Sequence, residues 1–124
     1  MLLRFTLARD GDIHLAIAQP GNASSTMIAE IPDPKSMTGA RNVYRAAVAQ
    51  TRRKFVALFG APQSGVWRSV DRRIEITGPA FFDLLHGQAG GLFGGAPTGV
   101  EIHPVLSIEI GAGTRRMGSN NKGP

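Results

Sequence analysis

The sequence predicts a mainly β protein with a single long helix, and three observations support this fold class. Short apolar runs separated by turn signals fill residues 2–31. Apolar side chains then recur at helical spacing over residues 41–59. Two further strand-like stretches follow at residues 67–77 and 100–110. The predicted order is therefore three strands, one helix and two strands.

The first third of the chain predicts a three-stranded meander. Residues 2–9 alternate loosely between apolar and polar side chains, and Asp-Gly-Asp at 10–12 is a tight-turn signal before the next apolar run. In residues 13–18 the odd-numbered side chains face one side of a strand and the even-numbered ones face the other. A second turn at 19–22 leads to a third strand at 26–31, which two prolines terminate.

The helix predicted at about 41–59 has a buried stripe. Thr38 or Asn42 is expected to cap its first turn, and Gly60 followed by Pro62 is expected to end it. Residues on the stripe share a spacing of three or four, which places them on one face. They are Tyr44, Ala47, Val48, Thr51, Phe55, Leu58 and Phe59.

This order of elements is that of a five-stranded Greek-key barrel of the oligonucleotide/oligosaccharide-binding (OB) type. In that fold the helix fills the gap between the third and fourth strands, a role for which an apolar stripe is suited. The competing fold is a strand-rich α+β sandwich. We expect one domain over residues 1–110 and a flexible tail, rich in Gly, Asn and Arg, over residues 111–124.

Composition narrows the classes of function. With 124 residues, 42% of them hydrophobic, the chain suits one domain with one core. The absence of cysteine excludes disulfides, thiolate metal sites and cysteine nucleophiles. No apolar run approaches the ~20 residues of a membrane span. As written, the chain is expected to be cytoplasmic, or secreted if a leader has been removed.

Positive charge is concentrated in the middle of the chain. The formal net charge is +5, and residues 35–68 hold seven basic residues and no acid. Arg41, Arg45 and Arg52 fall along one flank of the predicted helix, which suits an anionic partner such as single-stranded nucleic acid. The alternative is a basic surface that serves solubility and has no partner.

Three carboxylates form a first candidate site. Asp12 closes the first hairpin, Glu30 lies near the end of the third strand, and Asp33 follows between two prolines. Ends of neighbouring strands lie close together, so these groups could hold Ca²⁺ or Mg²⁺ through oxygen ligands and serve phosphodiester chemistry. The alternative is that all three are solvated turn and edge residues.

The segments that carry these acids, ARDGDIHLAI and TMIAEIPDP, resemble the opening of the staphylococcal nuclease family. The resemblance covers about residues 4–34. It implies an OB-type barrel, with Asp12 and Glu30 as metal ligands and Asp33 as the general base. The family's first catalytic arginine corresponds to Ser25, and no residue matches its second. Because those arginines stabilise developing charge, the resemblance favours the barrel over the activity.

A second candidate site combines histidines with a carboxylate. Glu101 and His103 are two residues apart on a predicted strand and so share a face, while His14 lies on the polar side of the second strand. His86 and Gln88 lie in the loop before the last strand. Imidazole and carboxylate groups could hold a transition metal, at Glu101 and His103 in particular, or perform acid–base chemistry. Alternatively, they fix the shape of the loop.

The same region, IEITGPAFFDLLHGQAG followed by APTGVEIHPVLSI, resembles an uncharacterised bacterial family of small OB-fold-like domains. Together with the DGDIHL motif, this resemblance spans almost the whole chain, and it implies no established activity.

From these observations the sequence predicts a domain that binds an anionic ligand, foremost single-stranded nucleic acid. One alternative is a metal-dependent phosphodiesterase that uses Asp12, Glu30 and Asp33. A second is an accessory domain that binds another protein. Ser25, at the position of a catalytic arginine, favours binding over hydrolysis.

Overall fold

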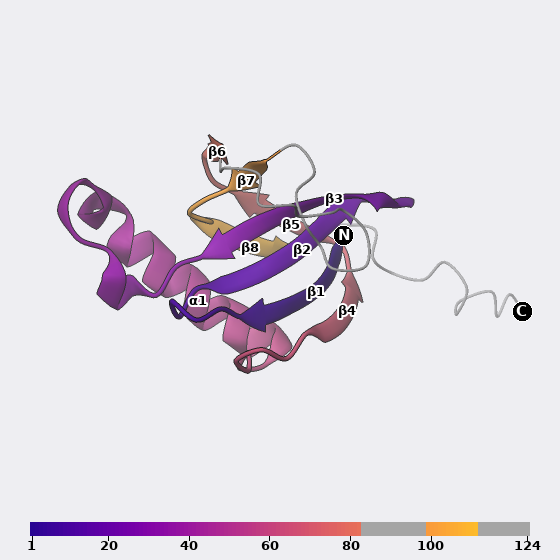
Figure 1. Ribbon diagram of the computed structural model, residues 1–124, viewed down its shortest axis with the longest axis horizontal. Coiled ribbons are helices and arrows are strands. Elements are labelled where there is room, and N and C mark those ends of the chain that lie inside the picture. Colours follow the sequence, from indigo (N-terminus) through magenta and orange to yellow (C-terminus); the bar gives the residue numbers. More distant parts are fainter. Residues whose placement is uncertain (83–98, 112–124) are drawn as a thin grey trace, which may run out of the picture.

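The computed structural model describes residues 1–82 and 99–111, apart from the side chains of residues 40–42 and 81–82. Within these residues the protein is mainly β, as predicted, with eight strands and one α-helix (Figure 1). The strands are β1 Leu2–Leu7, β2 Ile13–Gln19, β3 Asn22–Ile31, β4 Arg68–Arg72, β5 Ile74–Thr77, β6 Ala80–Phe82, β7 Val100–Ile102 and β8 Ser107–Ile110. The helix is α1 Arg45–Phe59, which follows the short 3₁₀ helices η1 Pro34–Ser36 and η2 Gly39–Tyr44.

Six of the strands form one sheet, in the order β4-β1-β2-β3-β7-β6. Strands β1, β2 and β3 are joined by antiparallel pairing, which confirms the predicted meander, although β3 begins at Asn22 rather than Thr26. Strand β4 pairs antiparallel with β1 at one side. On the other side β7 runs parallel to β3, with Ile28 paired to Glu101, so a segment 73 residues further along the chain lies beside the end of the meander.

The two strands predicted late in the chain are each split. Strand β5 follows β4 after the single residue Arg73, and β8 follows β7 after residues 103–106. Because β4 pairs with β1 whereas β5 pairs with β8, the chain changes its partner at Arg73. Strands β5 and β8 thereby form a separate two-stranded sheet. In the described part of the chain no sheet closes into a barrel, so the predicted closed barrel is not observed.

Helix α1 begins four residues later than predicted. Residues from Gly39 to Tyr44 form η2, and the α-helix extends only from Arg45 to Phe59. At its end the Gly60 N–H donates to the Val56 carbonyl, and Gly60 has φ of 92°, a conformation that favours glycine. The predicted end of the helix is therefore confirmed. No helix among the described residues is long and apolar enough to cross a membrane.

The buried face of α1 is narrower than the predicted stripe. Val48, Thr51 and Phe55 are buried, whereas Tyr44 is 42% exposed and Leu58 is 40% exposed. The prediction was wrong for these last two residues. Tyr44 precedes the first α-helical turn, so α-helical spacing does not carry it onto the stripe, and Leu58 lies at the stripe's edge in the last turn.

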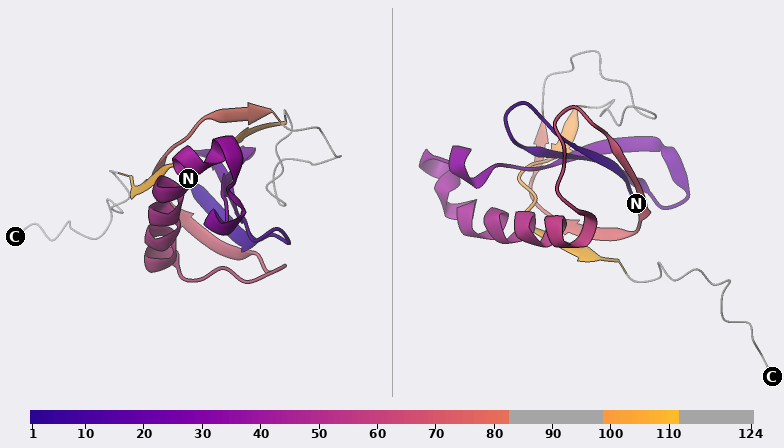
Figure 2. Two further views of the ribbon diagram at one scale, coloured as in Figure 1. Left: turned by 90° about the vertical axis from the view of Figure 1, so that its left-hand side faces the viewer. Right: turned by 90° about the horizontal axis from the view of Figure 1, so that it is seen from below.

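The core lies between α1 and one face of the strands. Figure 2 shows α1 along one side of the sheet. The Phe55 ring meets the Phe5 ring edge-on, with centroids 4.9 Å apart, and Phe59 lies 5.1 Å from Phe55. The fully buried cluster consists of Leu2, Phe5, Ile13, Leu15, Ala29, Ile31, Met37, Val48, Phe55, Val105 and Ile108. Its β2 and β3 members have odd residue numbers, so the even-numbered residues of these strands face the opposite side.

Candidate metal centre on the polar face of the sheet

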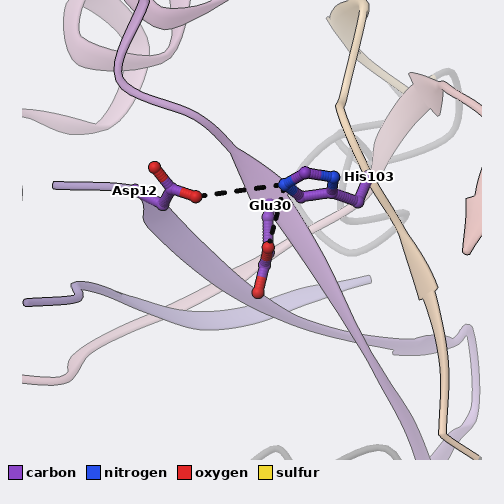
Figure 3. A group of neighbouring side chains, drawn as sticks. All are labelled: Asp12, Glu30 and His103. Carbon is purple, nitrogen blue, oxygen red and sulfur yellow. Dashed lines mark ion pairs between the residues drawn. The ribbon is translucent and has the colours of Figure 1, made fainter. Parts of the chain in front are cut away.

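Asp12, Glu30 and His103 converge on that opposite face. Each offers one ligand atom, and these atoms all lie within 4.8 Å of one another. The Nε2 atom of His103 lies 3.2 Å from Glu30 Oε2 and 3.9 Å from Asp12 Oδ2. Figure 3 shows the three side chains pointing toward one another from three separate segments of the chain. The group is large enough, and close enough, to hold one metal ion.

Strand register explains this convergence. Residue His14 of β2 lies directly opposite Glu30 of β3 in the antiparallel ladder. In the parallel ladder Ala29 lies opposite Ile102, so the next step along both segments brings Glu30 beside His103. His14, Glu30 and His103 therefore form one row across neighbouring segments of the sheet, with their side chains on the same face.

Asp12 joins the row from the turn between β1 and β2. Its N–H donates to Asp10 Oδ1 at 3.0 Å, and its carbonyl accepts from the Ala8 N–H at 2.9 Å. Gly11 has φ of 86°, which a residue with a side chain adopts only with strain. The Arg52 Nη2 atom donates to the Gly11 carbonyl at 2.8 Å, so a hydrogen bond ties α1 to this turn. The turn is thus fixed on both sides of Asp12.

In each carboxylate of the group one oxygen has a partner outside the group. Asp12 Oδ1 accepts from the Asp33 backbone N–H at 3.1 Å, and Glu30 Oε1 lies 3.0 Å from His14 Nε2. The second oxygens, Asp12 Oδ2 and Glu30 Oε2, face His103. Both carboxylates are thereby oriented toward the shared space.

The site is shielded from water, and its charges are coupled. Asp12 is 8% exposed, and burial alone raises the pKa of its carboxyl; the interaction with His103 and the Asp33 N–H outweigh burial and lower it overall. For His14, burial alone lowers the pKa of the imidazole, but the hydrogen bond to Glu30 and the charge of that carboxylate raise it overall. Both directions favour the ionised forms.

One nitrogen and two carboxylate oxygens are donors that divalent cations accept. Imidazole and carboxylate together suit first-row transition metals, while carboxylates alone suit Ca²⁺ and Mg²⁺. When the histidines are protonated, the same groups form ion pairs. A bound cation would take the place of the imidazolium charges. The metal-bound group and the group with protonated histidines therefore exclude one another.

The structure combines residues that the sequence predicted in two separate sites. Asp12 and Glu30 come from the first candidate site, and His103 and His14 come from the second. Asp33 lies next to the cluster, but its Oδ1 accepts from the Lys35 N–H and caps η1. Its contribution to the group is the backbone N–H rather than the carboxylate.

Other predicted site residues lie elsewhere or outside the described residues. Glu101 is buried on β7, where it lies opposite Ile28 and Phe81, and it is not a member of the group. His86 and Gln88 lie outside the described residues. Ser25 is exposed in the first half of β3, on the same strand as Glu30 but five residues before it.

Two of the three arginines on the predicted flank, Arg45 and Arg52, hold backbone carbonyls of other segments. Arg45 donates to the Met37 carbonyl, and Arg52 donates to Gly11 and Ile31 carbonyls at 2.8 and 3.3 Å. The Arg41 side chain lies outside the description. The bracing role of Arg52 was not predicted, because a basic residue on a helix flank carries no sequence signal for a carbonyl 41 residues away.

Two shallow hollows lie along the same flank and share Pro34. Arg52 and Arg53 line one of them with Ala49 and Val56, and Lys35 and Arg45 line the other. All the charged side chains that line these hollows are positive. We call these two hollows the basic groove. Its link to the candidate metal group is Arg52, whose Nη2 donates to the carbonyl of Gly11, the residue before Asp12.

No family model, curated protein or solved structure matches this chain. The two resemblances stated from sequence motifs therefore remain predictions.

Proposed function

We propose that the chain is an OB-fold-type domain that binds one divalent cation through Asp12, Glu30 and His103. The observation that carries this proposal is the convergence of their ligand atoms within 4.8 Å on a shielded face. A bound cation has open positions, and the oxygens of an anionic ligand would complete its coordination. Phosphate-bearing ligands carry such oxygens, and their negative charge suits a chain whose residues 35–68 hold seven basic residues and no acid.

The pairing of the strands supports the OB-type topology. The meander leads into a helix, and the next strand, β4, pairs with β1. The last segment returns parallel to β3 at β7 and antiparallel to β5 at β8. If β4–β5 and β7–β8 each count as one bent strand, five strands neighbour one another in a ring, in the order of a Greek-key barrel.

Metal binding is tested by titration calorimetry on protein freed of metal with a chelator. We expect Zn²⁺ or Mn²⁺ to bind at one site per chain, and Asp12→Asn or His103→Gln to abolish or strongly weaken that binding. Glu109→Gln is the matched control, because this carboxylate is exposed and lies outside the group. Failure of the wild-type protein to bind any of Zn²⁺, Mn²⁺, Ca²⁺ and Mg²⁺ would rule the proposal out.

Phosphodiester hydrolysis is the catalytic form of this proposal. Two observations disfavour hydrolysis. Ser25 is exposed and supplies no positive charge, and one oxygen of the Asp33 carboxylate caps η1. Arg52 is the guanidinium that the structure brings against the Asp12 turn, but two of its nitrogens already hold carbonyls. Release of 4-nitrophenolate from bis(4-nitrophenyl) phosphate by metal-loaded protein, lost in Asp12→Asn, would favour hydrolysis over binding alone.

The basic groove favours a second candidate function, binding of single-stranded nucleic acid. Lys35, Arg45 and Arg53 are exposed along the groove, and residues 35–68 contain no acid. A phosphate backbone lying along these cations would release counterions, so affinity should decrease as salt rises. Apolar Pro34 and Val56 line the same hollow and could contact bases.

Fluorescence anisotropy with a labelled oligothymidylate tests this second function. The triple variant Lys35→Gln, Arg45→Gln, Arg53→Gln should weaken binding and flatten its dependence on salt. A triple variant at Arg9, Arg72 and Arg73, which removes equal charge outside the groove, is the control. Equal loss in both variants would show that only net charge matters, and would contradict a binding site in the groove.

A further inference from the structure

In the proposed metal centre each carboxylate directs only one of its two oxygens toward the shared space. This arrangement indicates which class of cation the centre binds. Asp12 presents Oδ2 while the Asp33 N–H holds Oδ1, and Glu30 presents Oε2 while His14 holds Oε1. We propose that the centre selects a small transition-metal ion of the Zn²⁺ type over Ca²⁺ and Mg²⁺, and that His14 is a positioning residue for Glu30. This inference rests on the proposed metal site and deepens it.

The donor set decides between the two classes of cation. Ca²⁺ takes six to eight oxygens and commonly a carboxylate with both oxygens, which the contacts to Asp33 and His14 oppose here. Mg²⁺ prefers oxygen ligands and retains most of its water. Zn²⁺ accepts imidazole nitrogen and single carboxylate oxygens at about 2.0–2.2 Å in sites with few protein ligands. His103 supplies that nitrogen from a largely buried position between the carboxylates.

His14 acts on the cation only through Glu30. Its Nε2 lies 3.0 Å from Glu30 Oε1 and it is not among the three residues whose ligand atoms converge. The two residues are direct cross-strand partners, so the sheet itself sets their separation. A partner that hydrogen-bonds a ligating carboxylate fixes its orientation, and removal of such partners weakens metal binding about 10–100-fold.

The cation class is tested first on the wild-type protein, with no substitution. Competition titrations should show Zn²⁺ and Co²⁺ bound at least about 100-fold more tightly than Ca²⁺ or Mg²⁺. His103→Glu then supplies a third carboxylate of similar reach and should lower the Zn²⁺/Ca²⁺ affinity ratio at least about tenfold. Comparable wild-type affinity for Zn²⁺ and Ca²⁺, or a ratio unchanged in His103→Glu, would overturn the assignment of the cation.

The role of His14 is tested by two variants and a spectroscopic readout. His14→Leu removes the contact with Glu30 and should weaken Zn²⁺ binding about 10–100-fold, with a changed visible spectrum of the Co²⁺-loaded protein. His14→Gln keeps a hydrogen-bond donor and should restore most of the affinity and the spectrum. Equal Zn²⁺ affinity in His14→Leu and wild type would contradict the positioning role.

These outcomes separate this inference from the proposed function. Absence of any metal binding in the wild type defeats both. Binding that prefers Ca²⁺, or binding that ignores His14, defeats only the inference and leaves the metal site standing. Circular dichroism of each metal-free variant shows whether a loss of affinity reflects unfolding. The Zn²⁺/Ca²⁺ affinity ratio of the wild-type protein involves no substitution, so unfolding of a variant does not affect it.

Discussion

Glu30 contacts both imidazoles of the polar face. One of its oxygens lies 3.0 Å from the His14 imidazole and the other lies 3.2 Å from the His103 imidazole. Two carboxylates and two imidazoles in one row can reach neutrality by protonation of the histidines. A divalent cation reaches the same balance without those protons, so metal binding and protonation compete at this place.

The first prediction concerns the titration of His14 in metal-free protein. Contact with Glu30 holds the pKa of His14 above its ordinary value of 6.5, so Glu30→Gln should lower it. Because the folded-state pKa is the higher one, the contact stabilises the fold fully below the unfolded pKa and less as pH rises through the folded pKa. Proton NMR titration of the imidazole measures this, and a pKa that Glu30→Gln leaves unchanged would contradict the prediction.

All four residues of the proposed site were named as candidates from the sequence, but they were placed in two separate sites. Asp12 and Glu30 were predicted from turn and strand-end positions, and His14 from its place on the polar side of β2. Their association with His103 depends on the parallel pairing of β3 with β7, which joins segments about 70 residues apart. Local periodicity specifies which face a side chain occupies, and it contains no information about which distant strand becomes the neighbour.

At the scale of elements, helix α1 and the strands beneath it hold the core together through aromatic packing. Phe55 is fully buried, and its ring contacts both Phe5 from β1 and Phe59 from the last helical turn. The helix was predictable because its apolar spacing persists for four turns. Its start was not predicted correctly, because residues Gly39–Tyr44 form the 3₁₀ helix η2, which apolar spacing does not distinguish from an α-helical turn.

Truncation of this contact gives the second prediction. Phe55→Ala should lower the free energy of unfolding by about 3–5 kcal/mol, because it leaves a cavity in the centre of the core. Val56→Ala, at the adjacent and 36% exposed position, is the matched control and should cost far less. Urea unfolding measures both, and a cost below about 1 kcal/mol for Phe55→Ala would show that the core does not depend on this ring.

A close approach of two segments gives the third prediction. A methyl group on Gly78 would overlap the Pro104 carbonyl oxygen and lie 2.8 Å from Ile102 Cγ2. Gly78→Ala should therefore destabilise the fold by about 1–3 kcal/mol and displace the neighbouring His103. Metal affinity should decrease with it. Thermal unfolding and zinc titration provide the two measurements, and unaltered values in both would contradict the packing described around residue 78.

For the whole molecule, the proposed centre draws on parts of the chain that are distant in sequence. Asp12 comes from the first hairpin, Glu30 from the third strand and His103 from the segment that links β7 to β8. Such a site exists only in the folded protein. The meander and the mainly β character were predictable from turn chemistry, whereas the division of the late strands at Arg73 and at 103–106 depends on partners that only the complete fold supplies.

The fourth prediction follows from that dependence. A cation that binds the folded chain and not the unfolded one stabilises it by RT ln(1 + [L]/Kd), which is about 2.7 kcal/mol at a hundredfold excess over Kd. Added Zn²⁺ should raise the melting temperature of the wild type and leave that of His103→Gln unchanged. Calorimetric melting tests this, and an equal rise in both proteins would indicate binding at another place.

Arg52 connects the helix to the turn that carries Asp12, since its two terminal nitrogens hold the Gly11 and Ile31 carbonyls. It also lines the basic groove. A phosphate that engages this guanidinium competes with those carbonyls and loosens the Asp12 turn, so an anion in the groove and a cation in the centre should oppose one another. Thermodynamic reciprocity requires the antagonism to be equal in both directions. Zinc affinity measured with and without saturating oligothymidylate tests it, and identical values would show that the two sites are independent.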